Sequence, residues 1–164
     1  MGMGSQSSYD YDYIIIGSGF GGSVSAMRLV QKGYSVAVLE AGKRYRTGDF
    51  PKSNWNLRKY LWMPWLGLYG IQRLNLLDDF FLVSGAGVGG GSLVYANTLY
   101  VPGDPVLNSK GFKNMGGSKE LLPFYDVAIK MLGAVPNPTM TQADHLLKEA
   151  ADEMGKGDSF RMTP

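Results

Sequence analysis

The sequence predicts an α/β fold: a βαβ unit near the amino-terminal end, an added β-hairpin, and helices toward the carboxyl end. Two short β-branched runs enclose a segment whose apolar residues recur at helical spacing, and this order is typical of a βαβ unit. Glycine is concentrated in two clusters, at 17–22 and 84–92, which points to special loops rather than to a repeat. The 164 residues, 45% hydrophobic and 18% charged, suit one globular domain.

The first predicted strand is Tyr13–Ile16, which we interpret as a buried parallel strand closed by Gly17. Residues 23–34 follow with apolar side chains at every third position, which predicts an amphipathic helix of about three turns that ends at Gly33. A second strand is predicted over Ser35–Leu39. Strand, helix and strand in this order indicate a right-handed βαβ unit.

Between Gly42 and about Gly70 the apolar residues follow neither helical nor strand spacing. We expect a long excursion of the chain there, with a short helix near residues 55–61. Its aromatic residues are interpreted as ordinary packing, with a lid over an apolar substrate and contact with a membrane as alternatives. Residues 71–77 and 80–83 flank an acidic pair and predict a β-hairpin.

The second glycine cluster leads into the segment SLVYANTLYVP, and beyond that segment a glycine- and asparagine-rich loop is expected to about Ser118. A helix is predicted from Lys119 to Leu132, with its apolar residues on one face. Thr141 and Asp144 form a capping-box pattern that predicts a last helix ending at Met154.

The first glycine cluster, GSGFGG at 17–22, has the spacing of a dinucleotide-binding fingerprint. Gly17 gives the turn freedom in φ, Gly19 lets a diphosphate approach the backbone, and Gly22 lets helix and strand pack closely. Glu40 ends the second strand, where an acid accepts hydrogen bonds from ribose hydroxyls and disfavours the 2′-phosphate of NADP. The order predicts a Rossmann-like nucleotide site; the alternative is a set of turns and a surface acid.

The second glycine cluster, SGAGVGGGS at 84–92, has two interpretations. A backbone without side chains can lie against the diphosphate and ring system of an extended FAD, or it can form a tight corner after the hairpin. The residues alone leave both open. They therefore also leave open an NAD-binding module of a dehydrogenase and a non-catalytic nucleotide-binding domain.

Composition excludes several classes of site. Without cysteine there is no disulfide, thiolate metal site or catalytic thiol, and we expect no bound metal. The 16 basic and 14 acidic residues are interspersed, which argues against a nucleic-acid partner. Residues 60–71 are too short for a transmembrane segment. The first twelve residues are interpreted as a tag or flexible arm, and a cytoplasmic location is expected because no signal pattern is found there.

Four stretches resemble the amino-terminal part of the glucose-methanol-choline (GMC) flavoprotein oxidoreductases, particularly their bacterial cholesterol-oxidase branch. They are YIIIGSGFGGSVSAMRL, VLEAGKRY, GAGVGGGSLVYANTLYVP and LLPFYDVAIKMLGAVPNP. The resemblance reaches from about Tyr13 to Pro138. It favours FAD as the cofactor and the oxidation of the CH–OH group of an alcohol or sterol as the activity.

The resemblance also assigns the cofactor-binding residues. It implies that Glu40 holds the ribose, and that the FAD diphosphate and flavin are contacted by Gly17, Gly19, Phe20, Gly21, Gly22, Gly90, Gly91, Asn97 and Thr98. Two positions depart from the family pattern: Ala86, where a basic residue often stands, and Tyr95, where an asparagine often stands.

No catalytic residue is predicted. In the resembled family a catalytic histidine and its asparagine partner lie near the carboxyl terminus of much longer chains, and the only histidine here, His145, is interpreted as a surface residue of the last helix. We therefore expect residues 13–164 to be an amino-terminal, incomplete part of an FAD-binding domain, inactive alone. Its truncated sheet is expected to expose an edge through which the chain self-associates.

Overall fold

Two compact units make up the computed structural model, which describes residues 9–164. The first unit ends at Ala96, and the second runs from Asn97 to Pro164. Residues 1–8 of the predicted arm lie outside the described residues. Asp12, at its end, accepts hydrogen bonds from the backbone amide and the hydroxyl of Ser35, both at 2.7 Å.

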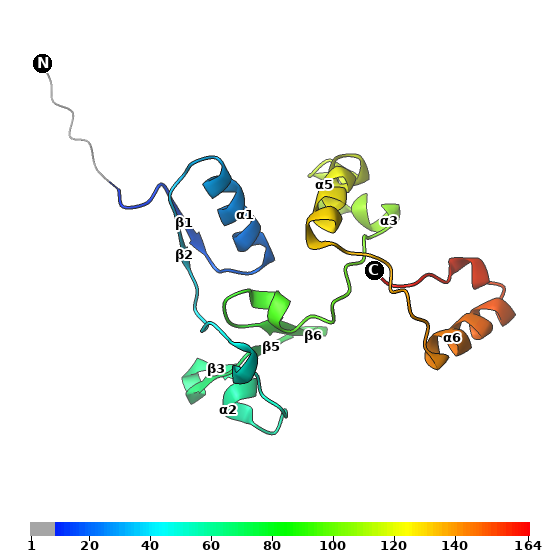
Figure 1. Cartoon of the computed structure of the whole chain (residues 1–164), viewed down its shortest axis with the longest axis horizontal. Coiled ribbons are helices and arrows are strands. Elements are labelled where there is room, and N and C mark those ends of the chain that lie inside the picture. The colour runs from blue at the N-terminus through cyan, green and yellow to red at the C-terminus, as the bar shows by residue number, and fades with distance from the viewer. Residues whose placement is uncertain (1–8) are drawn as a thin grey trace, which may run out of the picture. The chain divides into compact units, whose positions relative to one another are not determined.

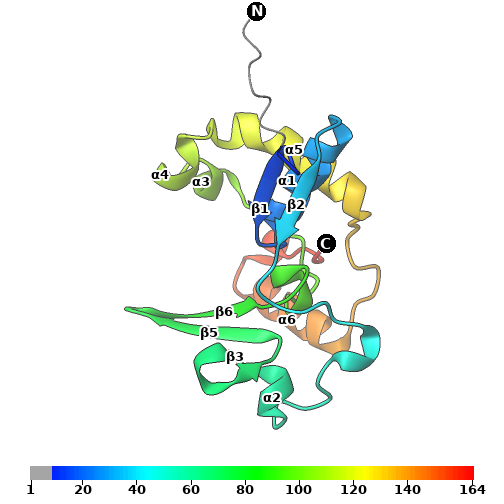
Figure 2. The same ribbon diagram turned by 90° about the vertical axis from the view of Figure 1, so that its left-hand side faces the viewer.

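The βαβ unit is present in the first unit, as predicted. Strands β1 (Tyr13–Ile16) and β2 (Val36–Leu39) pair in parallel, and helix α1 (Phe20–Gln31) packs against them (Figures 1 and 2). The helix begins earlier than expected because Gly19 adopts the extended conformation of an N-cap residue. Gly33, at φ +91°, follows its end.

The prediction that the first strand is buried is wrong. Ile15 lies half-buried on the side of α1, whereas Ile14 and Ile16 on the opposite face are 64% and 88% exposed. Successive side chains of a strand point to opposite faces, and among the described residues only α1 covers this sheet. A β-branched run therefore identified the strand correctly but not its burial.

The excursion contains more regular structure than predicted. Besides the expected short helix α2 (Leu57–Tyr60), strands β3 (Trp62–Met63) and β4 (Leu68–Tyr69) pair antiparallel around a 3₁₀ turn. This small hairpin buries Trp62, whose ring meets that of Tyr69 edge-on at 5.6 Å. The expectation of ordinary packing therefore holds for Trp62, while Trp65 is exposed.

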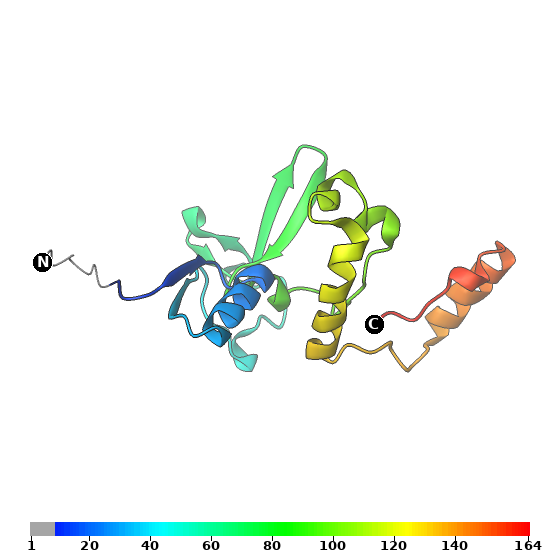
Figure 3. The same ribbon diagram turned by 90° about the horizontal axis from the view of Figure 1, so that it is seen from above.

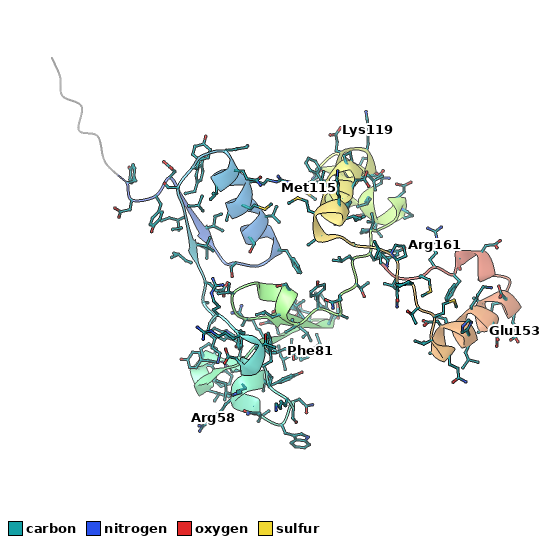
Figure 4. The ribbon with its side chains drawn as sticks, viewed as in Figure 1. Arg58, Phe81, Met115, Lys119, Glu153 and Arg161 are labelled. Atoms are coloured by element: carbon teal, nitrogen blue, oxygen red, sulfur yellow. The ribbon has the colours of Figure 1, made fainter. Side chains whose placement is uncertain are left out.

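The predicted β-hairpin consists of β5 (Gln72–Leu77) and β6 (Phe80–Gly85), which pair antiparallel with Gln72 opposite Gly85. Figure 3 shows it as a long two-stranded ribbon. Its tip exposes apolar side chains, Phe81 among them (Figure 4). Its base is anchored by a hydrogen bond from the Ala86 amide to the carbonyl of Ile71, and both of these residues are buried.

The second unit is helical. The prediction of a loop to about Ser118 is wrong, because this stretch folds into α3 (Asp104–Leu107) and α4 (Lys110–Lys113). Each follows an extended N-cap residue, Gly103 or Ser109, and a proline in the first turn of α3 suits a helix start. These cues are local and were hidden by the glycine-rich composition.

Two longer helices complete the second unit: α5 (Gly117–Leu132) and α6 (Gln142–Glu153). The predicted capping box at the start of α6 is confirmed, because Thr141 and Asp144 exchange hydrogen bonds. Among residues 9–164, no helix combines the length and apolar character needed to cross a membrane.

The second unit is expected to depend on Leu107 of α3, which is fully buried where α3 meets α5. Leu107→Ala should lower the free energy of unfolding by about 2 to 5 kcal/mol, because it leaves a cavity in a small core. Urea unfolding followed by circular dichroism measures this. Leu147→Ala, which truncates a leucine that is 64% exposed on α6, is the matched control and should change little.

Candidate nucleotide-binding site

A cleft of about 340 Å³ in the first unit brings the two glycine clusters together. Five of the predicted cofactor-binding residues line it: Gly17, Gly19, Glu40, Gly90 and Gly91. The remaining lining residues are Ile16, Leu39, Ala41, Arg73, Gly85 and Ala86. The walls are thus largely backbone at the carboxyl ends of β1 and β2, the edge at which parallel sheets bind their ligands.

The first glycine cluster has the geometry that the fingerprint requires. Gly17 adopts φ +92°, and its amide donates to the carbonyl of Leu39 at 2.7 Å, which joins the exits of β1 and β2. Gly22 has no room for a β-carbon beside the carbonyl of Gly17. A β-carbon on Gly19 would instead meet only open space, so the backbone there is accessible to a ligand.

Consecutive residues of the second cluster lie beside consecutive residues of the first. The amide of Gly89 donates to the hydroxyl of Ser18 at 3.1 Å, and a β-carbon on Gly90 would lie 2.8 Å from the Cα of Gly19. One residue further along, a β-carbon on Gly91 would lie 3.1 Å from the ring of Phe20. The second cluster therefore needs glycine in order to approach the first.

Phe20 adds an aromatic contact to this junction. Its ring meets that of Tyr95 edge-on, with centroids 5.8 Å apart. Tyr95 stands where the family pattern has an asparagine, so in this chain the position packs against the fingerprint helix. This geometry is favourable for two aromatic rings.

Glu40 is the acidic residue of the cleft lining. Its Oε2 accepts hydrogen bonds from the amide and the hydroxyl of Ser18, at 2.9 and 2.7 Å, and its Oε1 accepts one from the amide of Gly42 at 2.9 Å. Burial alone would raise the pKa of this carboxyl, but the hydrogen bonds from Gly42, Ser18 and Ala41 outweigh burial and lower it below its ordinary value of 4.5. Glu40 is therefore ionised at neutral pH.

Sequence reasoning missed two further close approaches of backbone to backbone. Gly42 has no room for a β-carbon beside Gly87, and Gly85 has none beside the carbonyl of Gly90. The amide of Val88 also donates to the carbonyl of Lys43 at 3.1 Å, which ties the second cluster to the exit of β2. The clustering of glycine was the available signal, but it did not tell which glycines meet.

Arg73 was also missed. It is the cationic residue of the cleft lining, opposite Ser84 in the β5–β6 register, and no ion pair is found for it among residues 9–164. Arg73 is exposed and lines the same cleft as Ala86, where the family pattern often has a basic residue. Only the pairing of the hairpin brings Arg73 there, so the sequence held no signal for it.

The other predicted site residues lie outside the cleft lining. Phe20, Gly21 and Gly22 form the first turn of α1, whose N-cap residue Gly19 offers no side-chain cap. The remaining two predicted contacts, Asn97 and Thr98, belong to the second unit.

The described part of the chain shows no metal site. His145 is exposed on α6, as the sequence predicted. Residues 9–164 contain no group of histidine and acidic side chains that could hold a metal ion.

Comparisons with known proteins agree with this geometry. A family model described as an NAD(P)-binding Rossmann-like domain matches residues 15–49. The chain is 56% identical over 156 residues to a cholesterol oxidase of Mycobacterium tuberculosis and 45% identical over 157 residues to a cholesterol oxidase of Acinetobacter baumannii. The chain is a homologue of the cholesterol oxidases. The resemblance to their bacterial branch and the Rossmann-like fold class are thus confirmed.

The match covers 94–95% of the chain but only 27–28% of those relatives. A shorter match, 60% identical over 35 residues, joins 21% of the chain to a soluble pyridine nucleotide transhydrogenase of Erwinia tasmaniensis. The transhydrogenase similarity thus covers about a fifth of the chain, whereas the cholesterol oxidase similarity extends over both units.

The pH dependence of stability should report on Glu40. Because its pKa is lowered in the folded chain, ionised Glu40 stabilises the fold above about pH 4.5, and this contribution is lost as the pH falls through the lowered pKa. Urea unfolding should therefore show Glu40→Gln less stable than the unmodified chain at pH 7, with a gap that narrows in acid. A gap that stays constant would contradict the assignment. The other carboxyls with lowered pKa, Asp12 and Asp144, are common to both proteins and cancel.

Proposed function

We propose that the chain forms part of the FAD site of an oxidoreductase that acts on the CH–OH group of an alcohol, with a sterol as the substrate class. The observation that carries the proposal is the convergence of both glycine clusters and Glu40 on one cleft. The first cluster by itself indicates only a βαβ unit that binds a nucleotide. The second cluster, held against it residue by residue, extends the bare backbone wall, as a long dinucleotide requires.

In this proposal the FAD diphosphate lies along Gly17, Gly19 and the first turn of α1, which comprises Phe20, Gly21 and Gly22. Glycines without side chains allow close approach, and the helix amino terminus favours an anion. Glu40 accepts a hydrogen bond from the ribose, since Oε1 keeps acceptor capacity beside the bond from Gly42. Gly90 and Gly91 continue this wall toward the flavin, and the contacts that the resemblance implies for Asn97 and Thr98 stay predictions.

The chemistry divides between cofactor and protein. Bound FAD accepts the hydride of the alcohol carbon, and a base removes the hydroxyl proton. The cleft lining offers binding groups but includes no histidine, so we expect the chain by itself to bind FAD without turning over alcohol. The sterol class rests on the names of the relatives, of which the chain spans little more than a quarter.

An NAD-binding module is the second candidate. It is favoured by the match to the NAD(P)-binding Rossmann-like model and by the short similarity to a pyridine nucleotide transhydrogenase. The match to the family model ends at residue 49, before the second glycine cluster, which the NAD candidate leaves without a role. The cytoplasmic location, the domain boundaries and self-association through a sheet edge stay predictions.

Binding of FAD tests the proposal. The gel-filtered chain, incubated with FAD, should carry flavin absorption bands, and Gly90→Ala should weaken FAD binding by about tenfold or more. The added β-carbon would press on Gly19, and φ +54° is unfavourable for alanine. Gly48→Ala, at a glycine of the same unit with open space around it, is the matched control. Retention of NADH in place of FAD would favour the second candidate.

Arg73 should strengthen FAD binding through the negative charge of the diphosphate. Arg73→Gln is expected to raise the Kd for FAD about tenfold at low salt, with a smaller effect at high salt because ions screen the interaction. Fluorescence titration of FAD measures both values. Arg58→Gln on α2 (Figure 4), an arginine of the same unit outside the cleft lining, is the control. Equal losses in the two variants would point to overall charge rather than to a site.

A further inference from the structure

Ser18 is a polar residue held in the interior of the first unit, with only 7% of its surface exposed. Its hydroxyl donates to Oε2 of Glu40 at 2.7 Å and accepts from the amide of Gly89 at 3.1 Å. Its own amide donates to the same Oε2 at 2.9 Å. One residue of the fingerprint therefore contacts both the acid and the second glycine cluster.

The Ser18 hydroxyl can donate only one hydrogen bond, and this limit fixes which partner receives its proton and which partner donates to its oxygen. A serine has one O–H donor, and here the carboxylate of Glu40 uses it, so the oxygen lone pairs face the Gly89 amide. A donor to a charged acceptor is polarised, which also makes its oxygen a better acceptor. The negative charge of Glu40 thus helps to hold the second cluster through Ser18.

The arrangement also orients the acid. With Oε2 engaged twice by Ser18, the carboxylate plane is set, and its open acceptor capacity lies on Oε1. Alanine in place of serine removes the hydroxyl from both partners. The Gly89 amide then loses its acceptor and Glu40 loses one of its donors.

We propose that Ser18 is a positioning residue that holds the second glycine cluster and the Glu40 carboxylate in their binding arrangement before the dinucleotide arrives. This rests on the proposed function of the cleft. No contact between Ser18 and the ligand is required, because Ser18 acts through Glu40 and Gly89.

The first test needs no ligand. In the chain labelled with ¹⁵N-glycine, hydrogen exchange of the Gly89 amide should become about tenfold faster in Ser18→Ala, and a carboxyl NMR titration should show the pKa of Glu40 raised. Ser23→Ala is the matched control, because the Ser23 hydroxyl donates to the carbonyl of Ser18 but touches neither Glu40 nor Gly89. Unchanged exchange at Gly89 in Ser18→Ala overturns the proposal. If Ser18→Ala does not fold, Ser18→Cys, with a weaker donor and acceptor, decides by the same two readouts.

The second test adds FAD. Ser18→Ala should raise the Kd for FAD about tenfold, and much less than that once Glu40→Gln is already present, because the two residues act together. Full additivity of the two losses, or an unchanged Kd in Ser18→Ala, overturns the positioning role. Failure of the unmodified chain to bind FAD overturns the proposed function instead, while the exchange of Gly89 still reports whether Ser18 holds the second cluster.

Discussion

The cleft depends on the carboxylate of Glu40. It lies at the exit of β2 and accepts hydrogen bonds from Ser18, at the exit of β1, and from Gly42, one turn of chain further on. The residue is only half-buried, and donors on both carboxylate oxygens stabilise the ionised form. The same hydrogen bonds that lower its pKa thus bring together the ends of two strands and, through Ser18, the second glycine cluster.

The second constraint on the cleft is that the glycines of the two clusters carry no side chains. A β-carbon on Gly90 would lie 2.8 Å from the Cα of Gly19, and one on Gly91 would lie 3.1 Å from the ring of Phe20. Gly42 and Gly85 meet further backbone of the same cluster. Glycine costs conformational entropy wherever it is ordered, so this concentration indicates a wall of backbone that must come close both to itself and to a ligand.

Apolar side chains are exposed at two places in the first unit. One face of the β1–β2 sheet is exposed, and the tip of the β5–β6 hairpin exposes apolar side chains. The chain spans little more than a quarter of the cholesterol oxidases that it matches. In the proposed function this part of the chain binds the cofactor, and the described cleft lining contains no histidine that could remove the hydroxyl proton.

Local patterns in the sequence determined the βαβ unit, the hairpin, the longer helices and the capping box, because each depends on neighbours within a few residues. They also marked Gly17, Gly19 and Glu40, whose spacing follows from the fingerprint itself. Only the tertiary structure decided the exposure of β1, the short helices α3 and α4, the contacts of Ser18 and Gly42, and the place of Arg73 in the cleft lining. Those features depend on partners far away in sequence, such as Gly89 for Ser18, and no periodicity records which distant backbone a residue will meet.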